Sequence, residues 1–316
     1  MHIEYGANTM NFTLDIIIPT YRPDQTFTEV ISRLLKQTYP INQILILDTE
    51  SGTFPASIPS MDPRIQVQSI PISEFDHGGT RHYGASLSKA DLILFMTQDA
   101  MPLNHKLIEH LIQPFTQDDV VVSYARQIAN SNSNILEKFT REFNYPNQSS
   151  VKSLDDLPTL GIKTYFCSNV CAVYKRERYM ALGGFVRHTI FNEDMIMAAN
   201  IVKAGYNIAY QADAVVTHSH KYSLLQNLRR NFDLAVSQYN HPEVFQQVKS
   251  TDEGFLYVKK VIQHLCESRN FHWIPYFVCE STMKYIGYKL GMKYKTLPMW
   301  LVRSLSMNVE YWNESY

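Results

Sequence analysis

Short apolar runs alternate with amphipathic stretches from Leu14 onward, and this alternation constrains the fold more than any other feature. The runs are rich in branched side chains and bounded by polar turns, which is typical of buried strands. The stretches between them place apolar residues at helical spacing, as Val30, Ile31 and Leu34 do. The alternation predicts an α/β fold with a mainly parallel sheet flanked by helices on both faces. The predicted strands are 14–19, 43–47, 64–70 and 91–96, and the predicted helices are 26–37, 78–89 and 105–115.

The later part of the chain is less regular, and its composition changes near the end. After about His220 it contains more Tyr, Lys, Arg and Trp, and its periodicity is helical. We therefore expect an α/β domain over residues 1–220 and a helical C-terminal region over residues 221–316. Within the first domain we also expect strands at 119–124 and 169–175, helices at 135–143 and 193–205, and an extended segment at 207–220.

Charge and segment composition exclude some classes of protein. With 29 Lys and Arg against 30 Asp and Glu, the net charge is −1, so no basic excess is available for a nucleic-acid partner. The four cysteines form no CxxC pair, and a chain of 316 residues does not depend on disulfides. No stretch approaches the ~20 apolar residues of a spanning helix, and residues 1–10 show no secretory signal. We expect a cytoplasmic protein that is soluble or peripheral to a membrane.

Polar residues follow the carboxyl ends of several predicted strands. In an open parallel sheet these ends lie along one edge, and ligands bind there. We therefore expect residues that are distant in sequence to gather around one ligand site. The candidates are Pro19, Thr20 and Tyr21 after the first strand, Asp48 after the second, His77, Gly78 and Arg81 after the third, and Gln98 and Asp99 after the fourth.

Two of these ends carry residues suited to a phosphate-bearing ligand. Asp99 can bind a hard divalent cation together with a diphosphate, although an Asp at this position can also cap a turn. The segment 77–84 opens a helix with two glycines and Arg81, which favours an anion, or it is a glycine turn with a surface Arg. Neither GxGxxG nor GxxxxGK[ST] is present, so a dinucleotide-binding dehydrogenase and a P-loop are disfavoured.

Two further clusters lie near the end of the first domain. Glu193 and Asp194 begin a predicted helix, where a carboxylate can take a proton from an attacking hydroxyl or merely compensate the helix dipole. The dipole is expected to lower the pKa of Asp194, so that any catalytic advantage comes from geometry. His218 and His220 alternate on an extended segment and point to the same face, where each is either a metal ligand or a structural histidine.

The ordered set of motifs resembles the GT-A glycosyltransferases of family 2, inverting enzymes that use nucleotide sugars. The resemblance covers about residues 13–220 and rests on IIIPTYRP, Asp48, HGGTR, QDA and NED. The segments FDHGGTRHYG, THSH and YKLGMKYKTLP are most similar to bacterial rhamnosyltransferases of surface-polysaccharide assembly, in particular the streptococcal type. The resemblance implies a GT-A (Rossmann-like) fold and transfer of L-rhamnose from dTDP-L-rhamnose to a hydroxyl group of a lipid-linked polysaccharide acceptor.

The resemblance also implies a role for each motif. Gln98 replaces one acid of the usual acidic pair, and an amide is a poor cation ligand although it can bind a ribose hydroxyl. A catalytic Mn²⁺ or Mg²⁺ shared with the donor diphosphate is still expected. The implied roles are catalytic base for Asp194, acceptor orientation for Glu193, metal binding for Asp99, His218 and His220, and donor binding for Pro19, Thr20, Tyr21, Asp48, His77, Gly78, Arg81, Gln98 and Asp99.

The segment 281–309 is basic and aromatic and contains no acidic residue. Such a helical segment suits an anionic membrane surface, where a lipid-linked acceptor would be found. It equally suits packing on the first domain or on a second subunit of a homodimer. Its basic residues are Lys284, Lys289, Lys293, Lys295 and Arg303, and Tyr285, Tyr288, Tyr294 and Trp300 lie between them.

Other functions are compatible with parts of this pattern. A glycoside hydrolase or phosphodiesterase would use Asp99 and Asp194 as a carboxylate pair and would act without a nucleotide sugar. A non-catalytic nucleotide- or sugar-binding subunit would keep Asp48 and Arg81 but would need no base, so the segment 192–194 counts against it.

Overall fold

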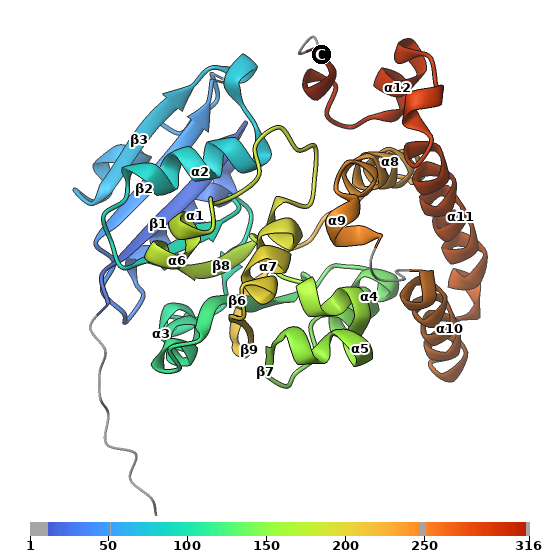
Figure 1. Ribbon diagram of the computed structural model, residues 1–316, viewed down its shortest axis with the longest axis horizontal. Coiled ribbons are helices and arrows are strands. Elements are labelled where there is room, and N and C mark those ends of the chain that lie inside the picture. Colours follow the sequence, from blue (N-terminus) through green and yellow to red (C-terminus); the bar gives the residue numbers. More distant parts are fainter. Residues whose placement is uncertain (1–11, 51, 247–250, 314–316) are drawn as a thin grey trace, which may run out of the picture.

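The computed structural model of the protein describes residues 12–50, 52–246 and 251–313. Residues 1–10, over which no secretory signal is expected, lie outside these ranges. A mixed nine-stranded sheet with flanking helices forms one side of the molecule, and the C-terminal helices form the other (Figure 1). The strands are β1 (Leu14–Tyr21), β2 (Gln43–Thr49), β3 (Ile65–Ile70), β4 (Leu92–Met96), β5 (Met101–Pro102), β6 (Val120–Ile128), β7 (Ser150–Lys152), β8 (Cys171–Lys175) and β9 (Asn207–Thr217). The α-helices are α1 (Gln25–Leu35), α2 (His77–Leu87), α3 (Leu107–Ile112), α4 (Ile135–Asn144), α5 (Leu157–Leu160), α6 (Arg176–Ala181), α7 (Glu193–Lys203), α8 (Leu224–Asn240), α9 (Pro242–Phe245), α10 (Thr251–Glu267), α11 (Ile274–Gly291) and α12 (Met299–Leu305).

The first part of the sheet is parallel, with strand order β3-β2-β1-β4. Successive side chains of β1 point to opposite faces and are buried on both. α1 packs on the face of Ile16 through Val30, whereas α2 and α7 pack on the face of Ile17 through Ala85 and Met197. The predicted strands and helices of this region, and the α/β class with helices on both faces, are therefore confirmed.

The second part of the sheet departs from the parallel arrangement. β8 lies between β4 and β6 and runs antiparallel to both, while β6 and β9 pair parallel. Cys171, the first residue of β8, lies opposite Met96, the last residue of β4. Because β8 runs antiparallel to β4, the chain enters β8 at the edge of the sheet where β4 ends. This places the segment 166–170 at the same edge as Asp99.

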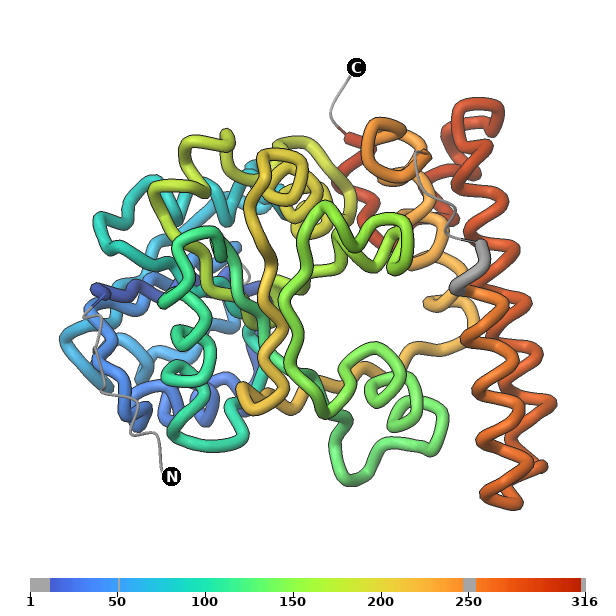
Figure 2. The backbone as a smooth tube through the Cα atoms, turned by 60° about the horizontal axis from the view of Figure 1, so that its bottom comes forward, coloured from blue at the N-terminus to red at the C-terminus, as the bar shows by residue number. Residues whose placement is uncertain are grey.

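The C-terminal helices are joined to the first domain by shared hydrophobic clusters. Leu136 of α4 packs with Val261 of α10 and Phe277 of α11. α8 and α11 lie so close that a Cβ added to Gly287 would lie 2.1 Å from the carbonyl oxygen of Leu228. In the view of Figure 2 the N-terminal strands and α10–α11 again lie at opposite sides. Within the described ranges, none of the helices combines the length and apolar content needed to cross a bilayer.

Candidate active site

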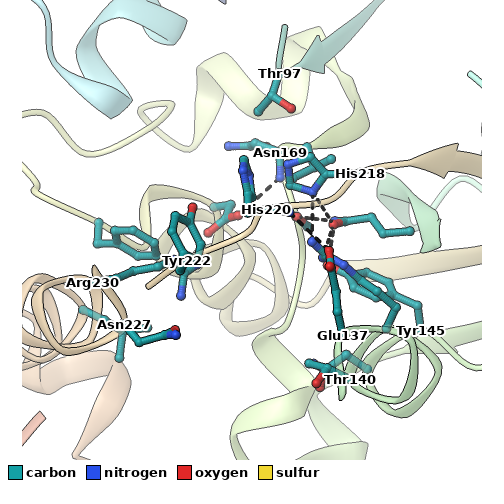
Figure 3. Close-up of a pocket in the computed structure, with 18 of the residues that line it drawn as sticks. Thr97, Glu137, Thr140, Tyr145, Asn169, His218, His220, Tyr222, Asn227 and Arg230 are labelled. Carbon is teal, nitrogen blue, oxygen red and sulfur yellow. Dashed lines mark hydrogen bonds between the residues drawn. The ribbon is translucent and has the colours of Figure 1, made fainter. Parts of the chain in front are cut away.

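A cavity of about 900 Å³ lies at the edge of the sheet where β4 and β9 end. Its volume falls within the range of ligand sites, roughly 300–1,000 Å³. Its walls come from the segment before β8, the beginning of α7, and the helices α4, α8 and α11. Figure 3 shows Asn169 from the first of these, Glu137 and Thr140 from α4, and Asn227 and Arg230 from α8. The residues predicted for the site that line it are His77, Arg81, Asp99, Glu193, Asp194, His218 and His220.

Asp99, His218 and His220 form a cluster that can hold a metal ion. The Asp99 Oδ2 atom lies 3.4 Å from Nε2 of His218 and 3.5 Å from Nε2 of His220. One ligand atom from each residue lies within 4.8 Å of the other two. Asp99 follows β4 and the histidines follow β9, so two strand ends that meet in the sheet edge build the cluster. Carboxylate and imidazole groups together suit divalent transition metals such as Mn²⁺.

Contacts behind His218 hold the orientation of its ring. Arg141 Nη1 can only donate, so the Gln127 side-chain atom that faces it at 2.6 Å is the oxygen Oε1. Nδ1 of His218 lies 2.9 Å from this oxygen and 3.3 Å from Nη2 of Arg141. This orientation turns Nε2 of His218 toward Asp99. The donor set is therefore arranged for a cation, with Gln127 orienting the imidazole from behind.

The protonation states of the cluster also favour a metal. Burial alone would raise the pKa of Asp99, but the hydrogen bond and charge of His218 outweigh it and hold that pKa well below its ordinary value. Burial and the neighbouring His218 lower the pKa of His220 to about 4. At neutral pH Asp99 is ionised and His220 is neutral, the forms that bind metals. An ionised Asp99 is also unsuited to be the acid of a hydrolase pair.

Glu193 and Asp194 begin α7, and both line the cavity. Asn192 precedes them with φ of 66°, a left-handed conformation that Asn tolerates better than most residues. Asn169, in the segment before β8, contacts both carboxylates. Its backbone N–H donates to Asp194 Oδ2 at 3.2 Å and its side-chain amide donates to Glu193 Oε1 at 3.3 Å. The antiparallel entry into β8 thus fixes the orientation of the two acids.

The two acids differ in proton affinity. Burial and the adjacent charge of Glu193 raise the pKa of Asp194 to about 7, against the hydrogen bonds from Asn169 and Met195. For Glu193, burial is outweighed by the charge of Arg81, whose Nη1 lies 3.4 Å from Oε1, and the pKa is lowered. The expectation that the helix dipole lowers the pKa of Asp194 is therefore wrong, because burial and a neighbouring carboxylate dominate. A carboxylate with a pKa near 7 is suited to act as a general base.

The segment that carries Arg81 is held by contacts within the protein. A Cβ added to Gly78 would lie 2.0 Å from the carbonyl oxygen of Val186, so this glycine is needed for chain packing. The Asp76 side chain accepts the N–H of Gly79 and so occupies the beginning of α2. Arg81 is 7% exposed and its Nε atom has no hydrogen-bond partner among the described residues. The side chain of Arg81 nevertheless lines the cavity, as does His77 at the beginning of the same helix.

A second group of predicted residues lies at the ends of β1 and β2, outside the cavity wall. Thr20 donates a hydrogen bond of 2.8 Å to Asp48, and burial raises the pKa of that carboxyl group. Tyr21 is 42% exposed. Both ends of the Gln98 amide bind the backbone of Tyr21, at 2.8 Å through Oε1 and 3.1 Å through Nε2. Gln98 thus joins the ends of β4 and β1, and its amide is already engaged where a ribose contact is expected. Pro19 and Gly78 also lie outside the cavity wall.

Sequence reasoning missed several residues of the cavity. Gln127 and Arg141 act through His218, and Asn169 acts through both acids of α7. No local pattern marks these positions. Three polar residues of the wall, Asn227, Arg230 and Glu280, come from α8 and α11.

The chain matches known proteins over most of its length. The model of the family described as "Glycosyl transferase family 2" matches residues 15–183. The O-antigen chain rhamnosyltransferase WbaN of Salmonella anatum is 39% identical over 306 residues, which cover 96% of each chain. The O-antigen chain rhamnosyltransferase RfbN of Salmonella typhimurium is 37% identical over 302 residues, 95% of this chain and 96% of the relative.

Solved structures share the fold at low sequence identity. A mannosyltransferase, PcManGT from Pyrobaculum calidifontis in complex with GDP-Man and Mn²⁺, superimposes with a TM-score of 0.62 over 91% of this chain and 89% of that one, at 12% identity. TarS 1-349 of S. aureus superimposes with a TM-score of 0.52 over 95% and 87% of the two chains, at 15% identity. These likenesses agree with the expected GT-A architecture.

Proposed function

The chain belongs to glycosyl transferase family 2, and on that basis we propose that it transfers L-rhamnose from dTDP-L-rhamnose to a hydroxyl group of a lipid-linked O-antigen-type saccharide. The choice of sugar is supported by two rhamnosyltransferases of the O-antigen chain that match nearly the whole chain. The observation that carries a transferase mechanism is the joint position of Arg81, Asp99, Asp194 and His218 around one cavity. This arrangement places a base beside a site for a diphosphate, and a non-catalytic binding subunit would not need the base.

We propose that Asp99, His218 and His220 hold a divalent metal ion, with Mn²⁺ preferred over Mg²⁺. Two imidazoles in the ligand set support this preference, because Mg²⁺ favours oxygen ligands. His220 makes up for the acid that Gln98 replaces. The bound ion would neutralise charge on the donor diphosphate.

The residues of the site perform a single displacement in this proposal. Asp194 takes the proton of the acceptor hydroxyl while its oxygen forms a bond to the anomeric carbon and the bond to the diphosphate breaks. Because attack and departure occur on opposite sides of that carbon, the configuration inverts. Glu193 remains ionised beside Arg81, and its charge keeps Asp194 basic. Thr20, Tyr21 and Asp48 hold the nucleotide at the neighbouring strand ends.

The donor proposal is tested by thermal unfolding with a panel of nucleotide sugars. We expect dTDP-L-rhamnose with Mn²⁺ to raise the melting temperature, since a ligand at a hundredfold excess over its Kd stabilises by about 2.7 kcal/mol. UDP-glucose, UDP-N-acetylglucosamine and GDP-mannose are the comparison donors. Equal stabilisation by all four, or by none, would contradict the assignment of the donor.

We also propose that an outer face of the C-terminal region contacts the cytoplasmic side of a membrane. We define this outer face by Val278, Tyr285, Lys289, Met299 and Trp300, of which Trp300 is 72% and Tyr285 61% exposed. Lys289 lies over the Tyr285 ring at 5.4 Å. Exposed aromatic and basic side chains suit an anionic lipid surface.

Flotation with lipid vesicles tests this contact. The protein is expected to float with vesicles that contain phosphatidylglycerol and to stay unbound with pure phosphatidylcholine, because each basic residue near an anionic surface contributes about 1 kcal/mol. The double variant Tyr285→Ser, Trp300→Ser should lose flotation while keeping its melting temperature. If the wild-type protein does not float and instead elutes as a dimer that this variant disrupts, the outer face is a contact between two copies of the chain.

A further inference from the structure

The cavity extends beyond the predicted donor residues to a wall built by α8 and α11. The residues of this wall follow residue 183, where the family match ends. The family match therefore assigns no role to the wall. Thr20, Tyr21 and Asp48, the residues expected to hold the nucleotide, do not line the cavity. The wall of α8 and α11 is therefore available to a second ligand, with Asp194 lining the same cavity.

A polar network occupies this wall. Asn227 of α8 is 6% exposed, and its side-chain amide donates to Glu280 Oε1 of α11 at 3.4 Å. Lys284 Nζ lies 2.7 Å from the same oxygen. Since both contacts use Oε1, the Oε2 atom of Glu280 remains open to a ligand among the described residues. A buried amide and a half-buried carboxylate at a cavity wall are suited to bind hydroxyl groups, as donor and acceptor respectively.

Aromatic side chains lie beside this network. Tyr222 stacks on His220 with ring centroids 5.2 Å apart, and the guanidinium of Arg230 lies 4.8 Å above the Phe191 ring. Figure 3 shows Tyr222, Arg230 and Asn227 grouped on one side of the cavity, away from Glu137 and Thr140. Flat apolar surfaces next to hydrogen-bonding groups match a sugar ring, which has apolar faces and a polar edge.

The packing of the two helices makes the wall rigid. α8 and α11 approach closely at Gly287, one turn after Lys284. The polar groups of the network are therefore held in place before a ligand binds, which lowers the entropic cost of binding.

We propose that Asn227 and Glu280, together with Tyr222, form the subsite that binds the sugar ring of the saccharide acceptor. This inference rests on the proposed transferase function and adds the residues that select the acceptor. Glu280 and Asn227 bind hydroxyls of the ring, and Tyr222 covers one of its faces. The acceptor is thus recognised by the C-terminal region, whereas the donor is recognised by the sheet.

Steady-state kinetics of Glu280→Gln and Asn227→Ala test the subsite. The donor is dTDP-L-rhamnose, and the acceptor probe is the lipid-linked saccharide fraction extracted from membranes of the cells that make the protein. Losing a hydrogen bond to a charged group weakens binding about tenfold or more, so Glu280→Gln should need that much more extract for half-maximal rate. Losing one to the neutral amide of Asn227 weakens binding about two- to tenfold, so the shift for Asn227→Ala should be smaller. Donor-induced thermal stabilisation should stay unchanged. The neighbouring variant Cys279→Ser, which changes an exposed thiol of α11, should behave like the wild type.

The outcomes separate this proposal from the one on which it rests. If both variants show the wild-type dependence on extract, the subsite is overturned and the transferase function stands. If the donor does not stabilise the wild-type protein and no sugar is transferred into the extract, the proposed function fails and the subsite fails with it. A variant with a lowered melting temperature is replaced by Glu280→Asp, which keeps the charge but shortens the reach and should give an intermediate effect.

Discussion

Replacing Asp194 with Asn is expected to lower the turnover number by about 100-fold or more while leaving donor affinity unchanged. An amide cannot take the acceptor proton, yet it has the same shape, and its single oxygen can still accept one of the two hydrogen bonds that Asn169 and Met195 donate to different oxygens of Asp194. The exposed residue Asp213 offers a matched control, and Asp213→Asn should retain full activity. Single-turnover kinetics with saturating donor give the measurement. A variant with normal turnover would remove Asp194 from the role of base.

The same residue predicts the pH dependence of the rate. Because burial and Glu193 raise the pKa of Asp194 to about 7, the base becomes protonated as pH falls through that value, and activity is lost on the acidic side. Glu193→Gln removes the neighbouring negative charge, so the acidic limb should move to lower pH. pH–rate profiles of the wild-type protein and of the Glu193→Gln variant measure this shift of the acidic limb. A limb that stays in place in the variant would show that Glu193 does not tune Asp194.

Loss of the metal cluster is expected to lower the turnover number about as much as Asp194→Asn does. His218→Ala and Asp99→Asn each remove one of three ligands, so Mn²⁺ should no longer raise the melting temperature and turnover should fall by about 100-fold or more. Gln127→Leu leaves all three ligands but releases Nδ1 of His218, and loss of such an orienting partner lowers metal affinity about 10- to 100-fold. The series should therefore be graded, with Gln127→Leu rescued by high Mn²⁺ concentrations.

Titration with Mn²⁺, followed by thermal unfolding and by the electron paramagnetic resonance of free Mn²⁺, measures this series. The exposed His105 provides the matched control, because His105→Ala changes a histidine away from the cavity. Unaltered Mn²⁺ binding in His218→Ala would show that the cluster of Asp99, His218 and His220 is not the metal site.

Local patterns were sufficient to predict most elements of the first domain. Buried strands such as β1 and amphipathic helices such as α1 are determined by residues near each other in the sequence, and both lie where the pattern places them. The antiparallel direction of β8 could not be predicted in this way, because apolar alternation is the same for a strand read in either direction. The consequence reaches the site, since the entry into β8 positions Asn169 on both acids of α7.

The pKa of Asp194 and the hydrogen bonds of Gln98 likewise could not be predicted from local sequence. The helix dipole is a local property and can be inferred from the sequence, but the burial of Asp194 and the ionisation of Glu193 by Arg81 depend on how α2 packs against α7. Similarly, the Gln98 amide binds the backbone of Tyr21, which lies 77 positions away in the chain.

The sequence by itself determined the family, the α/β class and the residue types of the site, because strand ends of a parallel sheet share one edge whatever the rest of the chain does. Only the tertiary structure decided what those residues do to one another: which nitrogen of His218 faces Asp99, which acid of α7 is basic, and that α8 and α11 close the cavity. The physical reason is that protonation, tautomer and ligand access depend on neighbours in space, and these neighbours come from segments that carry no mark of each other in the sequence.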